Sequence, residues 1–207
     1  MKNVFTVKHP LLEHSLTVLR DKATDTEAFR HHTAIVSQIM IMEATREFSL
    51  DPKPIETPLM PMIGAEIHRS IIFVPVLRAG ISMLFPARDF LPWAAVGFIG
   101  LERDDTTAIA REYYQKFPTD LENKRILVLD PMLATGGSLG DTIAALLKKG
   151  ARTISAVCIV AAPEGIACLH EKYPDVAIYV GAIDSHLDEH NYIVPGLGDF
   201  GDRYFGT

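Results

Sequence analysis

The sequence predicts an α/β fold, with a mostly parallel central sheet and helices on both of its faces. Short apolar runs alternate along the chain with longer segments whose apolar residues recur at helical spacing. The short runs are almost continuously apolar, which is typical of parallel strands buried on both faces. Strands that alternate with helices in this way favour one domain over residues 1–207.

The first long element is a helix predicted from Thr24 to about Phe48. Thr24 and Glu27 have the spacing of a capping box, in which each side chain bonds a backbone N–H at the helix start. We expect its apolar face to pack in the core or against another subunit. This face consists of Phe29, Ile35, Val36, Ile39, Met40 and Met42.

Strands and helices then follow in turn. Strands are expected at 71–76, 94–100, 126–129, 153–161 and 176–182, with helices at 81–89, 138–149 and 163–173 and a polar stretch at 102–118. Ser138 and Asp141 are predicted to cap the second of these helices, and Gly150 to follow its end. Because parallel strands end at one edge of a sheet, Arg78, Arg103 and Asp130 should converge there.

Composition limits the classes of partner. The 207 residues include 20 basic and 26 acidic side chains, and the net charge of −6 argues against nucleic-acid binding. No run approaches the ~18 apolar residues of a membrane span, and no secretory signal is visible. Cys158 and Cys168 are ten positions apart without a Cys-x-x-Cys pattern, which favours reduced thiols over a disulfide or metal pair. A cytoplasmic location is therefore expected.

Residues 126–138 carry the strongest chemical signal. A buried strand ends at Leu129, Asp130 follows it, and a loop of small residues leads into a helix. Backbone N–H groups and the positive end of the helix dipole meet at such a junction and favour an anion. The loop has neither the Gly-Lys-Ser/Thr of a Walker A motif nor the G-x-G-x-x-G dinucleotide spacing.

The carboxylate of Asp130 indicates which anion the loop would hold. A tight turn without a ligand remains the alternative interpretation of Thr-Gly-Gly-Ser taken alone. A carboxylate at the strand end, however, can accept hydrogen bonds from two sugar hydroxyls while the loop holds a phosphate on the same sugar. The combination favours a phosphorylated ribose.

At these residues the chain resembles the phosphoribosyltransferases, and specifically the uracil phosphoribosyltransferase family. The loop resembles the family's binding site for 5-phosphoribosyl 1-diphosphate (PRPP), in a form with one acid where most of the superfamily has two. Four further blocks and the last fifteen residues also resemble this family. The matching segments are His9-Pro10-Leu11, Glu43–Arg46, Pro75–Gly80, Asp130–Ser138, Val160–Gly165 and Tyr192–Gly206.

The resemblance implies roles for particular residues. It assigns Arg78 and Arg103 to the diphosphate, and bidentate binding of phosphate oxygens suits the guanidinium of Arg78. It assigns uracil to a segment at about 184–207, through the backbone of Ile193, Gly198 and Phe200 together with Asp199. No catalytic base is assigned, and Mg²⁺ is expected to travel with PRPP and water rather than on protein ligands. The full PRPP set is Arg78, Arg103, Asp130, Pro131, Met132, Leu133, Ala134, Thr135, Gly136, Gly137, Ser138 and Asp199.

Two segments carry further expectations. A flap over PRPP is implied at about 102–118, where Thr107–Glu112 departs from the family's acidic, proline-containing pattern and Tyr113–Lys116 matches it. Gly80 is expected to let the backbone approach a ligand closely. The glycine-rich tail at 192–203 is expected to be an ordered loop without helix or strand, because its apolar residues would not favour exposure.

The implied reaction converts uracil and PRPP to UMP and diphosphate in pyrimidine salvage. The alternatives are a transferase for another base, such as a purine, and a non-catalytic regulator that senses PRPP or UMP on the same fold. A homo-oligomer (dimer or tetramer) and activation by GTP are further expectations. The cluster of Asp184, His186, Asp188 and His190 is interpreted as a solvated loop rather than a metal site.

Overall fold

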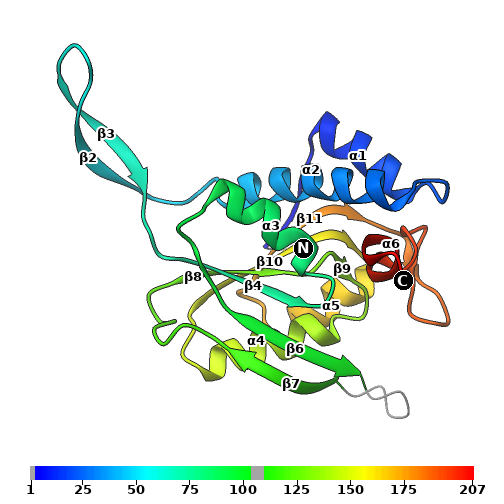
Figure 1. The fold of residues 1–207 in the computed structure, drawn as a ribbon. Helices are drawn as coiled ribbons and strands as arrows, with labels where there is room; N and C mark the ends of the chain where they lie inside the picture. Colours follow the sequence, from blue (N-terminus) through cyan, green and yellow to red (C-terminus); the bar gives the residue numbers. More distant parts are fainter. Residues whose placement is uncertain (1–2, 104–109) are drawn as a thin grey trace.

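The computed structural model describes residues 3–103 and 110–207, and its centre is a nine-stranded sheet (Figure 1). Two short strands, β5 (Ala95–Val96) and β9 (Met132–Leu133), pair with β4 and β10. In the described residues of this sheet all pairings are parallel except that of β6 with β7. The main order is β1 (Val4–Thr6), β11 (Ala177–Ile183), β10 (Thr153–Ala161), β8 (Arg125–Leu129), β4 (Ile71–Leu77), β6 (Phe98–Arg103) and β7 (Ala110–Lys116).

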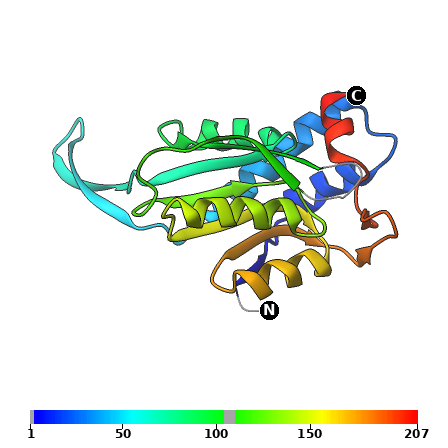
Figure 2. The same ribbon diagram turned by 90° about the horizontal axis from the view of Figure 1, so that it is seen from below.

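Helices cover both faces of the sheet, as the sequence predicts. Three of them, α1 (Pro10–Arg20), α2 (Thr26–Ala44) and α3 (Ile81–Phe90), lie on one side (Figures 1 and 2). The helices α4 (Gly137–Lys148) and α5 (Pro163–Lys172) lie on the other. The parallel sheet thus has helices on both of its faces, which bury it on each side, and this arrangement confirms the predicted α/β class.

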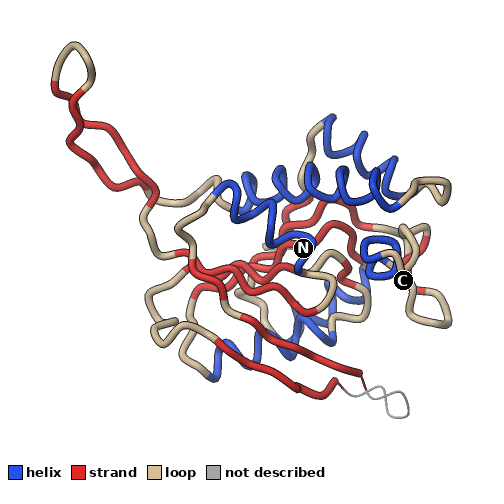
Figure 3. Tube along the Cα trace, viewed as in Figure 1, coloured by secondary structure: helices blue, strands red, loops and turns tan. Residues whose placement is uncertain are grey.

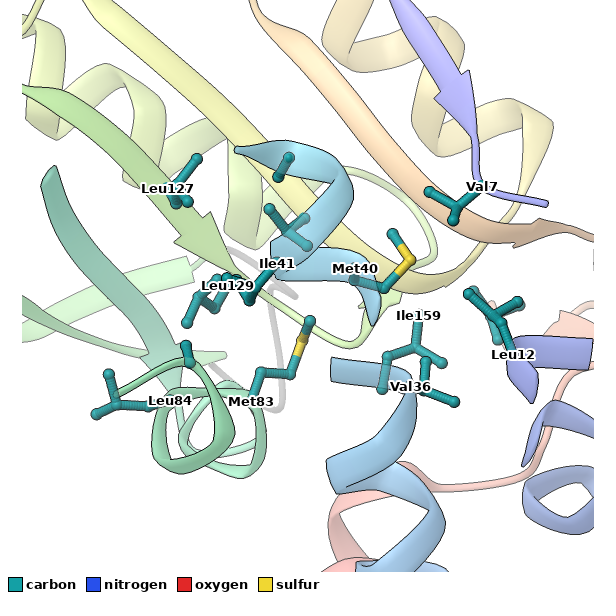
Figure 4. Close-up of a cluster of buried hydrophobic side chains, with 14 of the residues drawn as sticks. Val7, Leu12, Val36, Met40, Ile41, Met83, Leu84, Leu127, Leu129 and Ile159 are labelled. Atoms are coloured by element: carbon teal, nitrogen blue, oxygen red, sulfur yellow. The ribbon is translucent and has the colours of Figure 1, made fainter. Parts of the chain in front are cut away.

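The side chains of the central strands alternate between two apolar clusters. In β8, Leu127 and Leu129 pack with the α1–α3 side, whereas Ile126 and Val128 pack with α4 and α5. Figure 4 shows the first cluster, where Met40 and Ile41 from α2 lie among strand residues and Met83 of α3. This two-sided burial explains why the strands are apolar at consecutive positions.

The predicted long helix is shorter than expected and has a different cap. Asp25, and not Thr24, is the N-cap of α2, and its carboxylate accepts the Ala28 N–H at 2.8 Å. The helix ends at Ala44 rather than near residue 48. Phe29, Val36 and Met40 are buried as predicted, whereas Met42 is 57% exposed, which leaves packing against another subunit as the prediction for this residue.

The start of α4 also differs from the prediction. Its N-cap is Gly136, which has a φ of +83° and makes no side-chain capping bond, so the predicted Ser138–Asp141 pair is wrong. Glycine tolerates this left-handed conformation, which turns the chain sharply from the loop into the helix. At the other end Gly150 follows the helix with a φ of +92°, as predicted.

The predicted strand at 94–100 is divided into β5 and β6 around Gly97. A Cβ at Gly97 would lie 2.7 Å from Cδ1 of Phe117, which is why glycine stands at the break. The predicted polar flap at 102–118 is largely strand, because β6 runs to Arg103 and β7 returns antiparallel from Ala110. Residues 104–109, which include part of the atypical Thr107–Glu112 stretch, lie outside the described residues.

Four elements between residues 4 and 67 were not anticipated. Near the N-terminus, β1 joins the sheet edge, and His9 caps α1 by accepting the Leu11 N–H at 3.1 Å ahead of Pro10. The strands β2 (Leu50–Glu56) and β3 (Pro61–Ile67) form an antiparallel hairpin that projects away from the sheet (Figures 1 and 3). We call this hairpin the arm. Prolines within it obscure the strand pattern in the sequence.

The tail contains more regular structure than predicted. A short hairpin joins β12 (His186–Leu187) to β13 (Ile193–Val194), and α6 (Phe200–Phe205) follows, so the expectation of no helix or strand is wrong. Both Cys158 and Cys168 are free thiols, as predicted. Within residues 3–103 and 110–207, no helix is long and apolar enough to cross a membrane.

Candidate functional site

A small cavity lies where β8 ends and α4 begins. Its volume is about 40 Å³. Gly136 at the N-cap has no side chain to cap α4, and Thr135 Oγ1 accepts the Gly137 N–H at 3.4 Å. The other N–H groups of this first turn can serve an anion at the positive end of the helix dipole. The carboxylate of Asp130 accepts the Met132 N–H at 3.4 Å. We call this the loop cavity; it is lined by Asp130, Met132, Leu133, Ala134, Thr135, Gly136, Gly137, Ser138 and Leu139.

A larger cavity of about 320 Å³ adjoins it, and we call this the tail cavity. Met132 and Ala134 line both cavities, so the two lie side by side with a common wall at the carboxyl ends of the strands. A phosphate in the first would place an attached sugar toward the second. The tail cavity is lined by Arg78, Ala79, Met132, Ala134, Asn191, Tyr192, Ile193, Gly198, Asp199, Phe200 and Gly201.

Arg78 follows β4 and is exposed at the edge of the tail cavity. Its guanidinium lies against the tail, with the carbon atom Cζ 5.9 Å from the centre of the Phe205 ring. Gly80 is required for a reason the sequence did not give: a Cβ there would lie 2.3 Å from the Leu129 carbonyl oxygen. The close approach at Gly80 is therefore to a neighbouring strand, which brings Arg78 beside the end of β8.

The tail residues occupy distinct structural positions. Asp199 is the N-cap of α6, and its Oδ1 accepts the Asp202 N–H at 2.9 Å. Phe200 is buried, with its ring centre 5.2 Å from that of Phe29 in α2. Ile193 is buried as well, and Gly198 has a φ of +79°. Apolar side chains thus face the core, which leaves backbone groups of the tail for the cavity.

The backbone places two further predicted site residues. Pro131 is buried, and its carbonyl accepts the N–H groups of Ile159 and Val160 at 3.0 Å each, so it fastens the loop to β10. Arg103 is the last residue of β6, and its backbone pairs with Ala110. Prediction missed Ala79, Asn191, Tyr192, Gly201 and Leu139 among the lining residues; Tyr192 and Gly201 lie inside the tail block already singled out.

A buried thiol lies close to this site. Burial and, secondarily, the charge of Asp130 raise the pKa of Cys158 well above its usual range. The side chain is therefore a neutral thiol at neutral pH, and a neutral thiol is a poor nucleophile. Cys158 belongs to β10, and its side chain packs in the apolar cluster on the α4–α5 side of the sheet.

Two acids of the cluster at residues 184–190, Asp184 and Asp188, make contacts that stabilise the tail. The carboxylate of Asp184, 6% exposed, pairs with Arg20, so the prediction of a solvated loop is wrong for this residue. Asp188 accepts the backbone N–H groups of His190 and Tyr192 at 2.9 and 2.8 Å. In the described parts of the chain, no three His, Cys, Asp or Glu side chains are grouped so as to hold a metal ion.

Comparison with known sequences gives one consistent family. The model of the family described as "Uracil phosphoribosyltransferase" matches residues 6–207. A protein of that name from Oceanobacillus iheyensis is 47% identical over 208 residues, which covers 100% of both chains. Another, from Halalkalibacterium halodurans, is 46% identical over the same coverage.

Solved structures agree at the level of the fold. The AQ2163 protein from Aquifex aeolicus superposes with a TM-score of 0.93 at 36% identity, covering 99% of this chain and 98% of that one. An adenine phosphoribosyl transferase from Trypanosoma brucei, solved with AMP, pyrophosphate and ribose-5-phosphate, gives a TM-score of 0.60 at 13% identity over 92% and 88% of the chains. The second likeness shows the fold alone.

Proposed function

The chain belongs to the uracil phosphoribosyltransferase family. On that premise we propose that it converts uracil and PRPP to UMP and diphosphate, with the substrates bound in its two adjoining cavities. The observation that carries the proposal is the shared wall of Met132 and Ala134 between a loop cavity suited to a phosphate and a tail cavity suited to a base. In this assignment residues 130–138 hold the ribose phosphate and the tail holds uracil.

Each group would act mainly by positioning. Asp130 would accept hydrogen bonds from the ribose hydroxyls, and Arg78 would bind the departing diphosphate and stabilise its growing charge. Arg103 is proposed for the same leaving group, at the end of the neighbouring strand. The bond from the anomeric carbon to the diphosphate breaks as N1 of uracil attacks from the opposite face. The backbone of Ile193, Gly198 and Phe200, with Asp199, would read the base edge.

We propose Mg²⁺ as the cofactor, held by the diphosphate and by water. Two features support this arrangement: the described residues offer no grouped set of metal ligands, and the Asp199 carboxylate is already engaged at the start of α6. Mg²⁺ keeps several waters and often binds through substrate phosphates. Its contribution when bound is to neutralise charge on the diphosphate.

A UMP-formation assay with PRPP, Mg²⁺ and a panel of bases tests the function. We expect product from uracil alone, because cytosine and purines present the wrong donors and acceptors and leave buried polar groups unpaired. GTP is proposed as an activator on the family resemblance, and adding it to the same assay tests that point. Labelled RNA bound at moderate salt without UMP formation would instead favour the regulator.

We also propose a cytoplasmic location in pyrimidine salvage. Both cysteines are free, and Cys158 is buried within β10. Disulfides persist in oxidising compartments and are rare in the cytosol.

The arm supports the proposal of a homo-oligomer. It carries exposed apolar side chains along both strands and their turn, with Leu59 93% and Ile63 64% exposed. A two-stranded hairpin is marginally stable alone in water, and an exposed apolar surface of this kind marks an interaction site. The other exposed apolar residues of the arm are Leu50, Ile55, Met60 and Met62.

Changing Leu59 and Ile63 together to Thr is expected to weaken self-association. Threonine keeps strand propensity, so the hairpin can persist while its apolar contacts are lost. Sedimentation should show a dissociation constant raised at least about tenfold, which corresponds to about 1.4 kcal/mol. Leu147→Thr, at an exposed apolar residue of α4, is the matched control. A wild-type monomer at micromolar concentration, or unchanged mass in the double variant, would contradict the proposal.

A further inference from the structure

The wall of the tail cavity depends on a segment with little regular structure of its own. Seven of its eleven lining residues lie between Asn191 and Gly201. Here β12 and β13 have two residues each, and α6 has six. Strands and helices this short cannot fix backbone positions by themselves. Contacts with the rest of the protein must therefore hold the tail in place.

One such contact comes from Arg20 in the last turn of α1. Its guanidinium donates to both carboxylate oxygens of Asp184, at 2.8 and 2.6 Å, and to the Gly196 carbonyl at 2.6 Å. Asp184 in turn accepts the Gly196 N–H at 2.9 Å. The three residues form a closed network that joins the start of the tail to its turn. Gly196 has no room for a side chain, because a Cβ would lie 2.0 Å from the Ile193 carbonyl oxygen.

A second contact runs in the opposite direction, from α6 to α1. Arg203 donates to the carbonyls of Leu19 and Asp21, the latter at 2.6 Å. It also donates to the Leu197 carbonyl at 2.7 Å, within the tail itself. Its guanidinium lies 4.5 Å from the centre of the Phe29 ring in α2. Arg203 thereby ties the turn before α6 to two helices of the body.

Both contacts meet at residues 19–21, the C-terminal end of α1. The last carbonyls of a helix have no partner within the helix, and the helix dipole makes this end negative. A guanidinium is suited to such a place, because it offers several donors in a fixed plane. We name this arrangement the α1 clamp: Arg20, Asp184, Gly196 and Arg203, with the carbonyls of Leu19 and Asp21.

We propose that the α1 clamp sets the position of the base-reading backbone, so that Arg20 and Arg203 are positioning residues for the base. Neither is among the residues that line the tail cavity. This inference rests on the proposed function, because it assigns uracil to that cavity. Backbone groups that read a base edge must be placed closely, and a shift of about 1 Å in such groups can cost about 100-fold in rate. Asp130 and the loop cavity lie outside the clamp, so PRPP binding should depend on it far less than uracil binding, although Arg78 and Asp199 line the tail cavity.

Arg20→Met and Asp184→Asn test the clamp by splitting the two Michaelis constants. Methionine keeps an unbranched apolar side chain and removes the guanidinium with its hydrogen-bond donors. We expect KM for uracil to rise about tenfold or more in each variant, because the backbone groups that bind the base are displaced. KM for PRPP should stay within about twofold of wild type. Arg20→Lys should restore part of the loss, since lysine keeps the charge without bidentate geometry.

Arg152→Gln is the matched control, because Arg152 makes a 2.6 Å ion pair with Glu122 in an exposed position. It should change neither constant. Unchanged uracil KM in both clamp variants would overturn the proposal. So would an equal rise of both KM values together with a fall in melting temperature, because that result indicates a role in stability alone.

Hydrogen exchange of the ligand-free protein separates this inference from the proposed function. In Arg20→Met, backbone amides at 192–201 should exchange faster than in wild type, while those of β4 keep their rates. If the wild-type protein makes no UMP, the proposed function fails, and the exchange result still decides whether the clamp holds the tail. Equal exchange rates at 192–201 in the variant and the wild type would overturn the clamp.

Discussion

Replacing Asp130 by Ala is expected to lower kcat/KM for PRPP by about 100-fold or more, a loss of about 3 kcal/mol in transition-state stabilisation. The carboxylate stands at the end of β8 in the loop cavity, where it would hold the ribose hydroxyls. Its removal leaves the sugar free to turn while the phosphate stays bound. The fold should survive, because Asp130 is a partly exposed residue directly after β8 and its loss leaves no apolar cavity.

Asp130→Asn sharpens this test, since the amide keeps the size of the side chain and loses its charge. It should retain more activity than Asp130→Ala, because its carbonyl oxygen can still accept one hydrogen bond. Asp141→Asn, at an exposed acid on α4 near the same loop, is the control and should be unchanged. Initial rates of UMP formation and circular dichroism of each protein are the measurements. Normal rates in a folded Asp130→Ala would refute the ribose role.

Gly165→Ala is expected to cause the second large loss, at a residue that does not line either cavity. Gly165 lies in the first turn of α5, and a Cβ there would lie 2.2 Å from the Ala134 carbonyl oxygen. Ala134 lines both cavities, so displacing its backbone moves the wall they share. A shift of about 1 Å should lower kcat/KM about 100-fold. Overpacking at this contact should also destabilise the protein by about 1–3 kcal/mol.

Gly140→Ala provides the matched control in the other helix beside the loop. Its added Cβ would meet only Leu169 and Tyr173, at 3.7 and 3.9 Å, which is ordinary contact. Alanine is favoured over glycine inside a helix by about 1 kcal/mol, so this variant should be active and slightly more stable. The measurements are thermal unfolding and kcat/KM for PRPP in both variants and the wild type. Full activity in Gly165→Ala would show that the loop does not depend on its packing against α5.

Prediction from sequence worked best where local chemistry and position agree. The run from Ile126 to Ser138 predicted a buried strand, a strand-end acid and a loop at a helix start, and all three are present. The position of Arg78 was predicted in the same way. The apolar run before it predicts a strand, and the residue that follows a parallel strand lies at the edge of the sheet where ligands bind. These inferences needed no knowledge of distant partners.

Prediction failed where a partner distant in the chain decides the structure. From sequence Asp184 resembles a solvated or metal-binding acid, but in the structure it pairs with Arg20, which lies 164 residues away in the chain. The tail appeared too rich in glycine for a helix, yet Phe200 packs on Phe29 and stabilises α6. The role of Gly80 was likewise hidden, because the strand that crowds it is formed by residues near Leu129.

The sequence by itself determined the α/β class, the order of most strands and helices, and the loop with its acid, because propensity, periodicity and turn chemistry are local properties. Only the tertiary structure decided that the loop and tail cavities share a wall, that α1 holds the tail from two sides, and that the arm projects alone. Those features arise from contacts between segments far apart in the chain, and such contacts leave no periodic trace in the sequence of either segment.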